Sequence, residues 1–384
     1  MKANKAKYYI KTFGCQANIA DSHLVSSILE AIGVQKAKTM TDADVLVVNT
    51  CSVRQKSEDK VYGIAKKLKG RPKPFVIMSG CMVGSAVGER KRFELSVLQK
   101  KTPWVDLYLD PSRIKDLPEL LLERGIGIET PNIWEVAQEH FLKKIYEDFA
   151  IVNISYGCDN FCSYCVVPYS RGEEVSRSRE DIIREVQGFL IEEHGKLLLC
   201  GQNVNSWGLS KDEKAKVRIG STQKLPFAQL LREVHDLEGV KEISFLSSNP
   251  FDFTTDLVDA VALPKISNYI HIAAQSGNND VLKRMNRRHT VEEFIKLIDL
   301  LKQAKSRLEL GTDIIVGFPG ETEDQFMDTV RLFQKVKFNV AFISMYSERL
   351  GTFAQKNYED DVTLAEKKRR HAYLTKVWKE SLGA

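Results

Sequence analysis

Three cysteines lie close together in the stretch Tyr156 to Arg177, which reads YGCDNFCSYCVVPYSRGEEVSR. Cys158, Cys162 and Cys165 have the spacing Cys-x3-Cys-x2-Cys, and a loop this short can hold three corners of a 4Fe–4S cluster. The loop has no histidine or fourth cysteine, so a cluster there would keep one position open for a small molecule. A three-thiolate zinc site is the alternative, but structural zinc sites are closed by four ligands. We therefore expect an open cluster whose last ligand is a substrate or cosubstrate.

The other cysteines follow a second pattern. Cys15, Cys51 and Cys81 each come directly after an expected strand, about one βα unit apart. Because ligands bind at the carboxyl ends of strands in open α/β sheets, neighbouring strands would bring these thiols to one edge. Free cysteines are often small core residues, but burial alone would not place three of them in the same position after a strand. The sequence thus predicts a second three-thiol site, whereas Cys200 is expected to be a buried strand-end residue.

The first third of the chain alternates short apolar segments with helical periodicity, which indicates a parallel sheet covered by helices. Residues 110–147 are expected to connect this sheet to the rest of the chain, and we place the domain boundary between residues 1–140 and 141–384. The expected strands are Lys7–Thr12, Val45–Asn49, Phe75–Ser79 and Trp104–Leu109, and the expected helices are Asn18–Ile32 and Val53–Leu68.

The second part of the chain repeats the strand–helix alternation six times. A full TIM barrel has eight such units, so six predict a partial TIM-like β/α barrel with its active face at the carboxyl ends of the strands. The predicted fold class is therefore α/β: an open parallel α/β sheet domain followed by a six-stranded partial barrel. The segment from residue 363 to the end is expected to form one amphipathic helix. The expected barrel strands are Ile151–Ser155, Leu197–Cys200, Glu242–Leu246, Tyr269–Ala273, Asp313–Val316 and Ala341–Tyr346, with helices such as Asp181–Glu193 and Val291–Ala304 between them.

Small polar residues follow several of these barrel strands. Side-chain amides at such positions can hydrogen-bond a ribose or an amino-acid carboxylate, although any one of them can also be a turn former. Tyr164 either stacks on a base or plugs the end of the barrel. The GFPGET turn either lets the backbone approach a flat ligand or makes a tight βα turn. The predicted cofactor-binding residues are Tyr164, Arg177, Gln202, Asn203, Ser247, Gln275 and Gly317.

The bulk composition is that of a soluble protein. The 384 residues are 43% hydrophobic and 28% charged, enough for more than one core. A net charge of +5 permits a nucleic-acid partner without demonstrating one. The N-terminus lacks an apolar signal core, and no apolar run reaches the roughly 18–20 residues of a membrane span. We expect a cytoplasmic monomer without membrane contact, in which seven cysteines favour metal or catalytic roles over disulfides.

The three-cysteine loop after a first barrel strand, with an aromatic residue before its last cysteine, resembles the radical S-adenosylmethionine superfamily. In that superfamily the open iron binds the amino and carboxylate groups of S-adenosylmethionine, which is cleaved to methionine and a 5′-deoxyadenosyl radical. The longer stretch GCDNFCSYCVVPYSRGEEVSRS is similar to the methylthiotransferase branch, and most of all to the MiaB-type tRNA methylthiotransferases.

This resemblance extends over nearly the whole chain. TFGCQAN, NTCSVR and SGCMVG resemble the cysteine motifs of the family's N-terminal domain, and GQNVNSW, HIAAQSG, LKRMNRRHT and TDIIVGFPGET resemble its barrel motifs. Ala17 stands where the family usually has Met, and ERLGT where it has Pro-Arg-Pro-Gly-Thr. The family normally continues into a small RNA-binding β-barrel (TRAM) domain, for which this sequence has no room. We therefore expect either a truncated chain or a different way of binding tRNA.

The resemblance implies two 4Fe–4S clusters and S-adenosylmethionine as cofactors. One cluster would lie on Cys158, Cys162 and Cys165, and the auxiliary cluster on Cys15, Cys51 and Cys81. The implied reaction replaces the C2 hydrogen of isopentenyladenosine, beside the tRNA anticodon, with a methylthio group. An external electron donor and a sulfur source are implied partners. Because that hydrogen is not usefully acidic, acid–base catalysis cannot remove it, and radical chemistry explains the cofactor.

Two other functions remain open at this point. One is methylthiotransfer to another substrate, either threonylcarbamoyl-adenosine in tRNA or a ribosomal-protein aspartate. The other, more remote, is a two-cluster electron carrier or redox sensor. Fully ligated clusters would suit a carrier, whereas three thiols at each site and polar strand ends favour an enzyme.

Basic residues gather in LKRMNRRHT, beside the loop after the fourth barrel strand. Such a run usually means a solvated helix face, but it can also contact RNA phosphates. Its place near the barrel mouth and the family resemblance favour RNA. We predict Arg284, Arg287 and Arg288 as substrate-binding residues, with Lys283 and His289 in the same patch.

Overall fold

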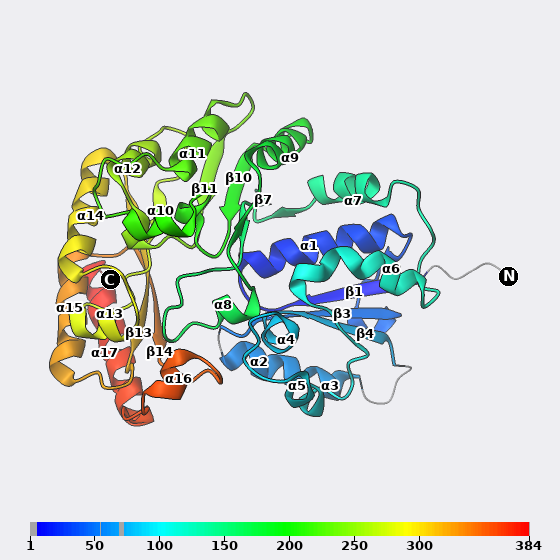
Figure 1. Ribbon diagram of the computed structural model, residues 1–384, viewed down its shortest axis with the longest axis horizontal. Coiled ribbons are helices and arrows are strands. Elements are labelled where there is room, and N and C mark those ends of the chain that lie inside the picture. The colour runs from blue at the N-terminus through cyan, green and yellow to red at the C-terminus, as the bar shows by residue number, and fades with distance from the viewer. Residues whose placement is uncertain (1–5, 54, 69–72, 384) are drawn as a thin grey trace.

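The computed structural model describes residues 6–53, 55–68 and 73–383, which form two α/β units lying side by side (Figure 1). In the described part of the N-terminal unit, five strands form one sheet in the order β2-β1-β3-β4-β5. All neighbouring strands in it are parallel, which confirms the expected open parallel sheet. The strands are β1 Lys7–Thr12, β2 Gln35–Lys36, β3 Val45–Thr50, β4 Phe75–Gly80 and β5 Leu107–Tyr108.

Helices cover both faces of this sheet (Figure 1). Val45 and Val47 of β3 face one core, and Leu46 and Val48 face the other, because successive side chains of a strand point to opposite sides. The first core is covered by α1 Gln16–Ala31, α6 Leu117–Leu122 and α7 Ile133–Leu142. The second is covered by α2 Gln55–Tyr62, α3 Ile64–Lys67, α4 Cys81–Val87 and α5 Leu95–Lys101.

Several boundaries in the N-terminal unit differ from those expected. The helix expected over 53–68 is divided into α2 and α3 at Gly63, and Arg54 lies outside the described residues. The last strand shrinks to Leu107–Tyr108, because only these two residues pair with β4. Helix α7 runs across residue 140 and packs against α1, so a boundary at that residue would divide a helix.

The second unit contains the six expected barrel strands. In its described residues β7 Phe149–Asn153, β10 Lys196–Cys200 and β11 Glu242–Phe245 are parallel neighbours, as are β12 Tyr269–His271, β13 Glu309–Val316 and β14 Val340–Met345. Parallel bridges from Ile243 to Ile266 and from Ser248 to Ile272 join the two groups. The partial barrel is therefore confirmed, with β6 Ile145–Tyr146 added as an antiparallel neighbour of β7 and β8 Ser155–Tyr156 paired with β9 Val175–Ser176.

Helices pack on the outside of this barrel. The longer ones are α9 Arg179–Ile191, α11 Pro226–Asp236, α12 Thr255–Val261, α14 Val291–Ala304, α15 Glu323–Val336 and α17 Leu364–Ser381. The shorter ones are α8 Val167–Ser170, α10 Lys211–Lys216, α13 Asn279–Arg284 and α16 Phe353–Asn357. Thr290 and Thr322 begin α14 and α15 with reciprocal capping boxes, which satisfy backbone N–H groups that the first helical turn leaves free.

Alternation along the barrel strands separates an outer core from an inner face. Leu197 and Leu199 of β10 pack into the main core under the outer helices, whereas Leu198 and Cys200 point inward. There they pack against Ala20 of α1, so the first helix of the N-terminal unit covers part of the barrel interior. The expected burial of Cys200 is confirmed.

Gly84 is the position where α4 touches α8 of the second unit most closely. A Cβ there would stand 2.1 Å from the backbone carbonyl oxygen of Ser170, so Gly84→Ala must push the two helices apart. We expect a loss of about 1–3 kcal/mol in the free energy of unfolding, measured by urea denaturation. Gly63→Ala is the control, because φ is −65° there and the nearest atom stands 3.4 Å away. Equal urea midpoints for the two variants would contradict the close contact.

Candidate active site

The three-cysteine loop begins with a glycine that no other residue can replace without a shift of the backbone. Gly157 has φ +71°, and a Cβ there would stand 2.0 Å from the carbonyl oxygen of Glu173. This closeness lets the Cys158 N–H donate to the carbonyl oxygen of Gly172 at 3.3 Å. The stretch after Cys165 therefore folds back over the start of the loop.

The far end of the loop is held by the segment after α13. The Ser163 N–H donates to the carbonyl oxygen of Met285 at 3.0 Å, and its hydroxyl donates to that of Arg284 at 2.8 Å. The Asn286 side-chain amide donates to the carbonyl oxygen of Phe161 at 3.0 Å. The backbone at Phe161 is left-handed, with φ +46°, so these contacts maintain an uncommon conformation.

The thiols of this loop suit a cluster better than a single metal ion. The described residues contain no group of three or more His, Cys, Asp or Glu side chains placed to bind one ion. A zinc site needs such a group, whereas the three thiolates of a cubane bind three different irons. Burial, followed by the charge of Cys162, raises the pKa of Cys165 to about 12. Such thiols stay protonated until a metal binds and displaces the protons.

Two donors would stabilise thiolates in this loop. Arg287 Nη1 lies 3.6 Å from Cys162 Sγ, and the Val167 N–H donates to Cys165 Sγ at 3.4 Å. Tyr164 packs in an apolar cluster with Met285 and Phe318. Both of its expected roles, stacking on a base and plugging the barrel end, stay predictions. The donor set therefore fits a 4Fe–4S cluster with one open iron.

The second trio meets at the carboxyl edge of the N-terminal sheet, as the sequence predicted. Cys15 precedes α1, Cys51 follows β3, and Cys81 is the first residue of α4. Gly14 has φ +119°, and a Cβ there would stand 2.8 Å from Cys51 Cβ, so the first two loops are in close contact. The Val53 N–H donates to Cys51 Sγ at 3.4 Å. This set also fits a cluster held by three thiols.

Buried side-chain amides that were not expected from the sequence support the second trio. The Asn18 side-chain amide donates to Thr50 O at 2.8 Å and to Asn49 Oδ1 at 2.9 Å. Asn49 in turn donates to the carbonyl oxygen of Asn18 at 2.7 Å. These bonds tie α1 to the end of β3. Each of the motifs TFGCQAN and NTCSVR contains one of these asparagines, and this is the feature of the sequence that could have indicated their role.

The two trios face each other across the contact between the units. Burial, then the charges of Cys162 and, more weakly, Cys81, raise the pKa of Cys165. Desolvation by the surrounding protein and the charge of Cys81 likewise raise the pKa of Cys15, although this residue keeps an exposed surface. Cys81 therefore lies within electrostatic range of thiols from both trios, although it is far from the barrel loop in sequence.

A buried ion pair lies beside the second trio. Arg171 Nη1, from the stretch after the three-cysteine loop, lies 2.6 Å from Asp21 Oδ2 on α1, and both side chains are less than a tenth exposed. Burial lowers the pKa of Arg171, but the charges of Asp21 and Cys81 raise it well above its usual value overall. A permanent cation is thus fixed beside Cys15 and Cys81 of the second trio.

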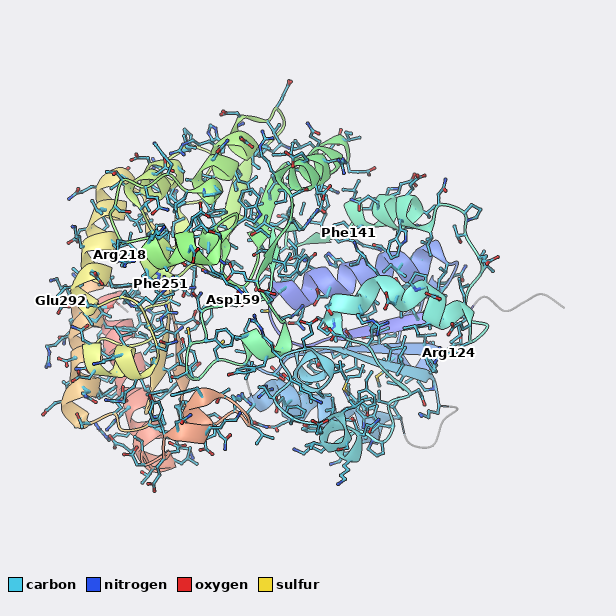
Figure 2. All side chains as sticks on the ribbon, viewed as in Figure 1. Arg124, Phe141, Asp159, Arg218, Phe251 and Glu292 are labelled. Atoms are coloured by element: carbon cyan, nitrogen blue, oxygen red, sulfur yellow. The ribbon has the colours of Figure 1, made fainter. Side chains whose placement is uncertain are left out.

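Further arginine contacts join the units around this centre. Arg90 Nη1 lies 2.6 Å from Asp159 Oδ1, near the middle of the molecule in Figure 2. Arg92 donates to the carbonyl oxygen of Leu350 at 2.8 Å, and Arg349 donates to that of Val53 at 3.0 Å. Arg349 comes from the stretch that departs from the family pattern, yet it still reaches the loop after Cys51.

Comparison with known proteins identifies the family. Residues 7–109 match Uncharacterized protein family UPF0004, and residues 152–333 match the radical SAM superfamily. A tRNA-2-methylthio-N(6)-dimethylallyladenosine synthase of Thermoanaerobacter pseudethanolicus is 38% identical, covering 96% of this chain and 77% of the relative. The synthase of Thermotoga petrophila is 37% identical, covering 97% and 82%. This chain belongs to that synthase family.

Two solved structures of radical S-adenosylmethionine enzymes resemble this chain in fold. The radical S-adenosylmethionine methyltransferase TsrM from Kitasatospora setae has a TM-score of 0.61 at 14% identity, covering 92% of this chain and 75% of that one. The cobalamin-dependent S-adenosylmethionine radical enzyme OxsB has a TM-score of 0.53 at 13% identity, covering 96% and 56%. At these identities the likeness concerns the fold alone. Within the described residues, no helix is long and apolar enough to cross a membrane.

The residues predicted to bind the cofactor lie at the strand ends, but several are occupied by internal bonds. Asn203 is fully buried and its amide donates to Ser206 Oγ at 2.7 Å and to Asp252 Oδ2 at 3.1 Å. Arg177 donates to the carbonyl oxygen of Asn153 at 2.7 Å and pairs with Glu185 at 2.9 Å. Their cofactor roles stay predictions, and the bonds indicate that both residues shape the site from behind.

Of the other predicted contacts, Gln202 and Ser247 are more available to a ligand than the buried Gln275 and Gly317. Gln202 Oε1 is buried and has no hydrogen bond among the described residues. Ser247 is exposed with φ +70°, and Gln275 has φ +69° where it bonds the backbone of β13. Gly317 also has a positive φ, and a Cβ there would stand 2.4 Å from Lys367 Cγ. Gln202 is the strongest of these candidates for binding a cofactor.

The expected basic patch is wrong for two of its five members. Arg287 is buried, and besides Cys162 it bonds Asn249 Oδ1 and the carbonyl oxygen of Ala273, each at 2.6 Å. Burial, then the charge of Arg287, holds the pKa of His289 well below its usual value, so this ring is neutral. Arg287 turns inward to the cluster loop and His289 packs between Phe251 and Phe294, so the segment does not form one surface.

The outer members of the patch are partly engaged. Arg288 pairs with Asp252 at 2.8 Å and lies over the Phe251 ring at 4.4 Å. Arg284 donates to the carbonyl oxygen of Gly320 at 3.2 Å, and its Nε has no partner among the described residues. Phosphate contacts from Arg284 and Arg288 stay predictions.

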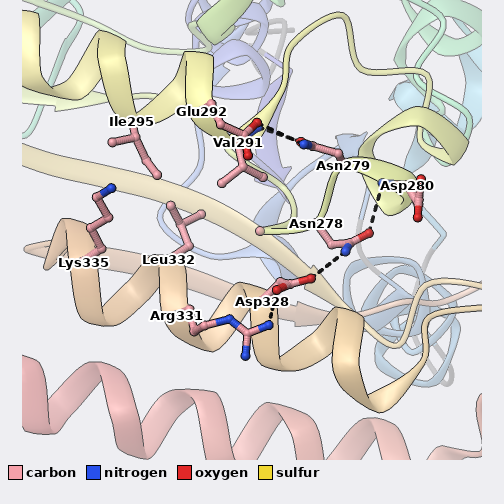
Figure 3. A pocket seen from close by; sticks show the side chains of 11 residues that line it. Asn278, Asn279, Asp280, Val291, Glu292, Ile295, Asp328, Arg331, Leu332 and Lys335 are labelled. Atoms are coloured by element: carbon pink, nitrogen blue, oxygen red, sulfur yellow. Dashed lines mark hydrogen bonds and ion pairs between the residues drawn. The ribbon is translucent and has the colours of Figure 1, made fainter.

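A cavity of about 300 Å³ lies elsewhere, on the outside of the barrel between α13, α14 and α15 (Figure 3). Polar groups on its wall pair with one another: Asn278 donates to Asp328 at 2.6 Å, and Asn279 donates to Glu292 at 3.0 Å. None of the cysteines or predicted contact residues lines it. The cavity is therefore not part of the candidate active site.

The iron content tests the independence of the two trios. Anaerobic reconstitution should load about eight irons per chain, from two four-iron clusters. The triple variant with Cys15, Cys51 and Cys81 changed to Ala should keep about half, because the other trio lies in a different unit. Cys200→Ala is the control, since this buried thiol belongs to neither trio and the variant should keep all the iron. Complete loss of iron in the triple variant would contradict two separate sites.

The stability of two arginine variants tests the buried ion pair. Arg171→Gln leaves the Asp21 carboxylate buried without its cation, which should lower the free energy of unfolding by about 3–5 kcal/mol. Arg113→Gln is the control, because its ion pair with Asp116 is largely exposed and is worth about 0–1 kcal/mol. Chemical denaturation of the cluster-free proteins measures both. Similar losses in the two variants would show that the Arg171 pair is not a special contact.

Proposed function

We propose that this protein replaces the C2 hydrogen of N6-isopentenyladenosine in tRNA with a methylthio group. The observation that carries the proposal is that the two three-thiol sites lie close together across the contact between the units, with Cys81 within electrostatic range of Cys15 and of Cys165. A sulfur-inserting reaction needs a radical generator and a sulfur carrier close enough to act on the same carbon. Two trios on opposite sides of one contact between units supply that arrangement.

Relatives of this chain support the substrate. The curated relatives are named as synthases of a 2-methylthio derivative of N(6)-dimethylallyladenosine in tRNA, and this chain covers more than two thirds of their length. Dimethylallyl and isopentenyl name the same N6 substituent here. The anticodon stem-loop, an external electron donor and a sulfur source are the partners that this reaction requires.

The chain's own residues prepare the site for this chemistry. When bound, the two clusters supply the electron that cleaves S-adenosylmethionine and the place where sulfur is held. Cys158, Cys162 and Cys165 hold the first cluster, and Cys15, Cys51 and Cys81 hold the second. Arg287 and Arg171 place positive charge beside the thiolates of each site, which favours their deprotonated form.

Other residues close the site around the reacting groups. The Arg90–Asp159 and Arg349–Val53 contacts keep the units together, so the two thiol sites maintain a fixed separation. Such positioning converts an encounter of separate reactants into a reaction within one complex. When bound, S-adenosylmethionine would supply the methyl group for sulfur and, after cleavage by one electron from the external donor, the radical that abstracts the C2 hydrogen.

Two alternatives receive less support. Methylthiotransfer to threonylcarbamoyl-adenosine or to a ribosomal-protein aspartate would use the same two sites, but the relatives at 37–38% identity carry the name of the dimethylallyladenosine synthase. An electron carrier would have clusters fully ligated by the protein. Three thiols at each site favour a catalyst over a carrier.

The products formed by two cysteine variants test the division of roles. Cys158→Ala should form no 5′-deoxyadenosine under reducing conditions, because it removes a ligand of the radical-generating cluster. Cys51→Ala should still form 5′-deoxyadenosine but no methylthio nucleoside, because it damages only the sulfur-carrying site. Liquid chromatography with mass spectrometry of the nucleosides measures both products. Cys200→Ala is the control and should form both.

Methyl labelling separates the sulfur carrier from an electron relay. With methyl-labelled S-adenosylmethionine and no reductant, the parent should accumulate an acid-labile methylthio group, because methyl transfer to a nucleophilic sulfur needs no electron. The Cys51→Ala variant should accumulate none. Normal labelling of that variant would place the methyl acceptor outside the N-terminal unit and would overturn its proposed role.

A further inference from the structure

Three hydrogen-bonded side chains cross the interior of the barrel from β12 to β13. Tyr269 Oη lies 2.9 Å from His271 Nδ1, and His271 Nε2 lies 2.7 Å from Asp313 Oδ2. Because an ionised carboxylate only accepts hydrogen bonds, Nε2 carries the proton and donates. In a neutral imidazole Nδ1 then accepts from the Tyr269 hydroxyl. The carboxylate is therefore oriented by two partners in series.

The backbone of β13 makes room for this chain of side chains. A Cβ at Gly311 would stand 2.1 Å from the Tyr269 hydroxyl and 2.6 Å from His271 Nδ1. Only glycine leaves the space that the two rings occupy. Gly311 and Asp313 are two residues apart on one strand, so they lie on the same face of the sheet. The hydrogen-bonded chain is thus built into the strand rather than formed by chance.

That face is the interior of the barrel, close to the three-cysteine loop. Ile314 and Val316 of β13 belong to the outer core, so Asp313 and Ile315 point the opposite way. Ile315 packs in the same apolar cluster as Tyr164 of the loop. The Asp313 carboxylate is therefore a near neighbour of the proposed radical site.

Asp313 also has capacity left for a ligand. Its side chain is 41% exposed, and Oδ2 is occupied by His271. Oδ1 has no hydrogen bond among the described residues. On the neighbouring strand Phe342 stands in register with Asp313, its side chain is 46% exposed, and its ring lies 5.8 Å from the His271 ring. A carboxylate oxygen with no hydrogen bond among the described residues thus lies beside a partly exposed aromatic side chain.

We infer that Asp313 and Phe342 form the sub-site for the substrate base, in which Oδ1 accepts the N6–H of an N6-alkylated adenine. A ligand for this pair must offer one N–H donor next to a flat or apolar surface, and a mono-alkylated adenine does so. Phe342 would pack on the base or its alkyl group. His271 and Tyr269 are positioning residues that hold the carboxylate. This inference rests on the proposed function and names the residues that select its substrate.

The Asp313→Asn variant tests the sub-site. The amide oxygen would accept from His271, which leaves the NH2 group to face the N6–H of the substrate, donor against donor. We expect kcat/KM for methylthio product to fall by about tenfold or more, the effect of losing one hydrogen bond to a charged group. The substrate is an anticodon stem-loop RNA carrying N6-isopentenyladenosine. Asp299→Asn, on the exposed face of α14, is the matched control and should equal the parent.

A second RNA shows whether recognition involves the N6–H. With N6-methyl-N6-isopentenyladenosine in the same position, the donor is absent, so the parent should lose at least about tenfold in kcat/KM. Asp313→Asn should discriminate between the two RNAs much less than the parent does. Equal discrimination by parent and variant would overturn the inference. A purely structural defect would lower both rates together and would leave the discrimination intact.

Two further outcomes separate the inference from the proposal beneath it. If cleavage of S-adenosylmethionine without RNA falls as much as product formation, Asp313 serves that cosubstrate and the inference is overturned. If the parent makes no methylthio product at all, the proposed function fails, and the sub-site fails with it. If the parent is active and Asp313→Asn equals it, only the inference fails.

The positioning role of His271 needs a readout of its own. His271→Gln keeps an N–H donor near the place of Nε2, whereas His271→Leu keeps the bulk without the donor. We expect the Gln variant to retain most of the discrimination between the two RNAs, and the Leu variant to lose it because the carboxylate is no longer oriented. Equal loss of discrimination in both variants would overturn the positioning role.

Discussion

The buried ion pair between Arg171 and Asp21 is the contact on which the relation between the two thiol sites depends. It joins α1 to the stretch after the three-cysteine loop, and neither side chain is exposed by more than a tenth. Burying a charged side chain costs free energy unless an opposite charge is paired with it. Separating the units would therefore expose both side chains to water or leave each one buried without its partner. The guanidinium also lies within range of Cys15 and Cys81, where it offsets the charge of thiolates. One residue therefore contributes to the contact between units and to the electrostatics of a site.

Around this contact the barrel interior has two different sides. Near β10 it is apolar and is covered by Ala20 of α1, whereas near β12 and β13 it contains the hydrogen-bonded chain that ends at Asp313. A full barrel would fill its interior with side chains, but six strands leave β14 at an edge, paired only with β13 in the described residues.

The segment from Lys283 to His289 shows how far a local pattern can be interpreted. Its five basic residues suggested one surface, yet Arg287 turns inward to Cys162 and His289 is buried and neutral. A run of basic residues in the sequence shows which charged groups are present, but it does not show towards which side each side chain points. Here the left-handed backbone at Asn286 separates inward from outward positions. Arg287 interacts more strongly with the thiolates than an exposed arginine would, because electrostatic interactions are stronger away from water.

The sequence alone determined the two cysteine trios, their positions after strands, the parallel sheet and the six-stranded barrel. These features are local, because thiol spacing, strand periodicity and helix caps each depend on residues within a few tens of positions of one another. Tertiary structure decided that the trios face each other, that Arg171 meets Asp21, and that His271 reaches Asp313. The partners in these pairs lie 150 and 42 residues apart. Such pairs arise only when packed strands and helices bring distant segments together, and periodicity along the chain does not encode which segments meet.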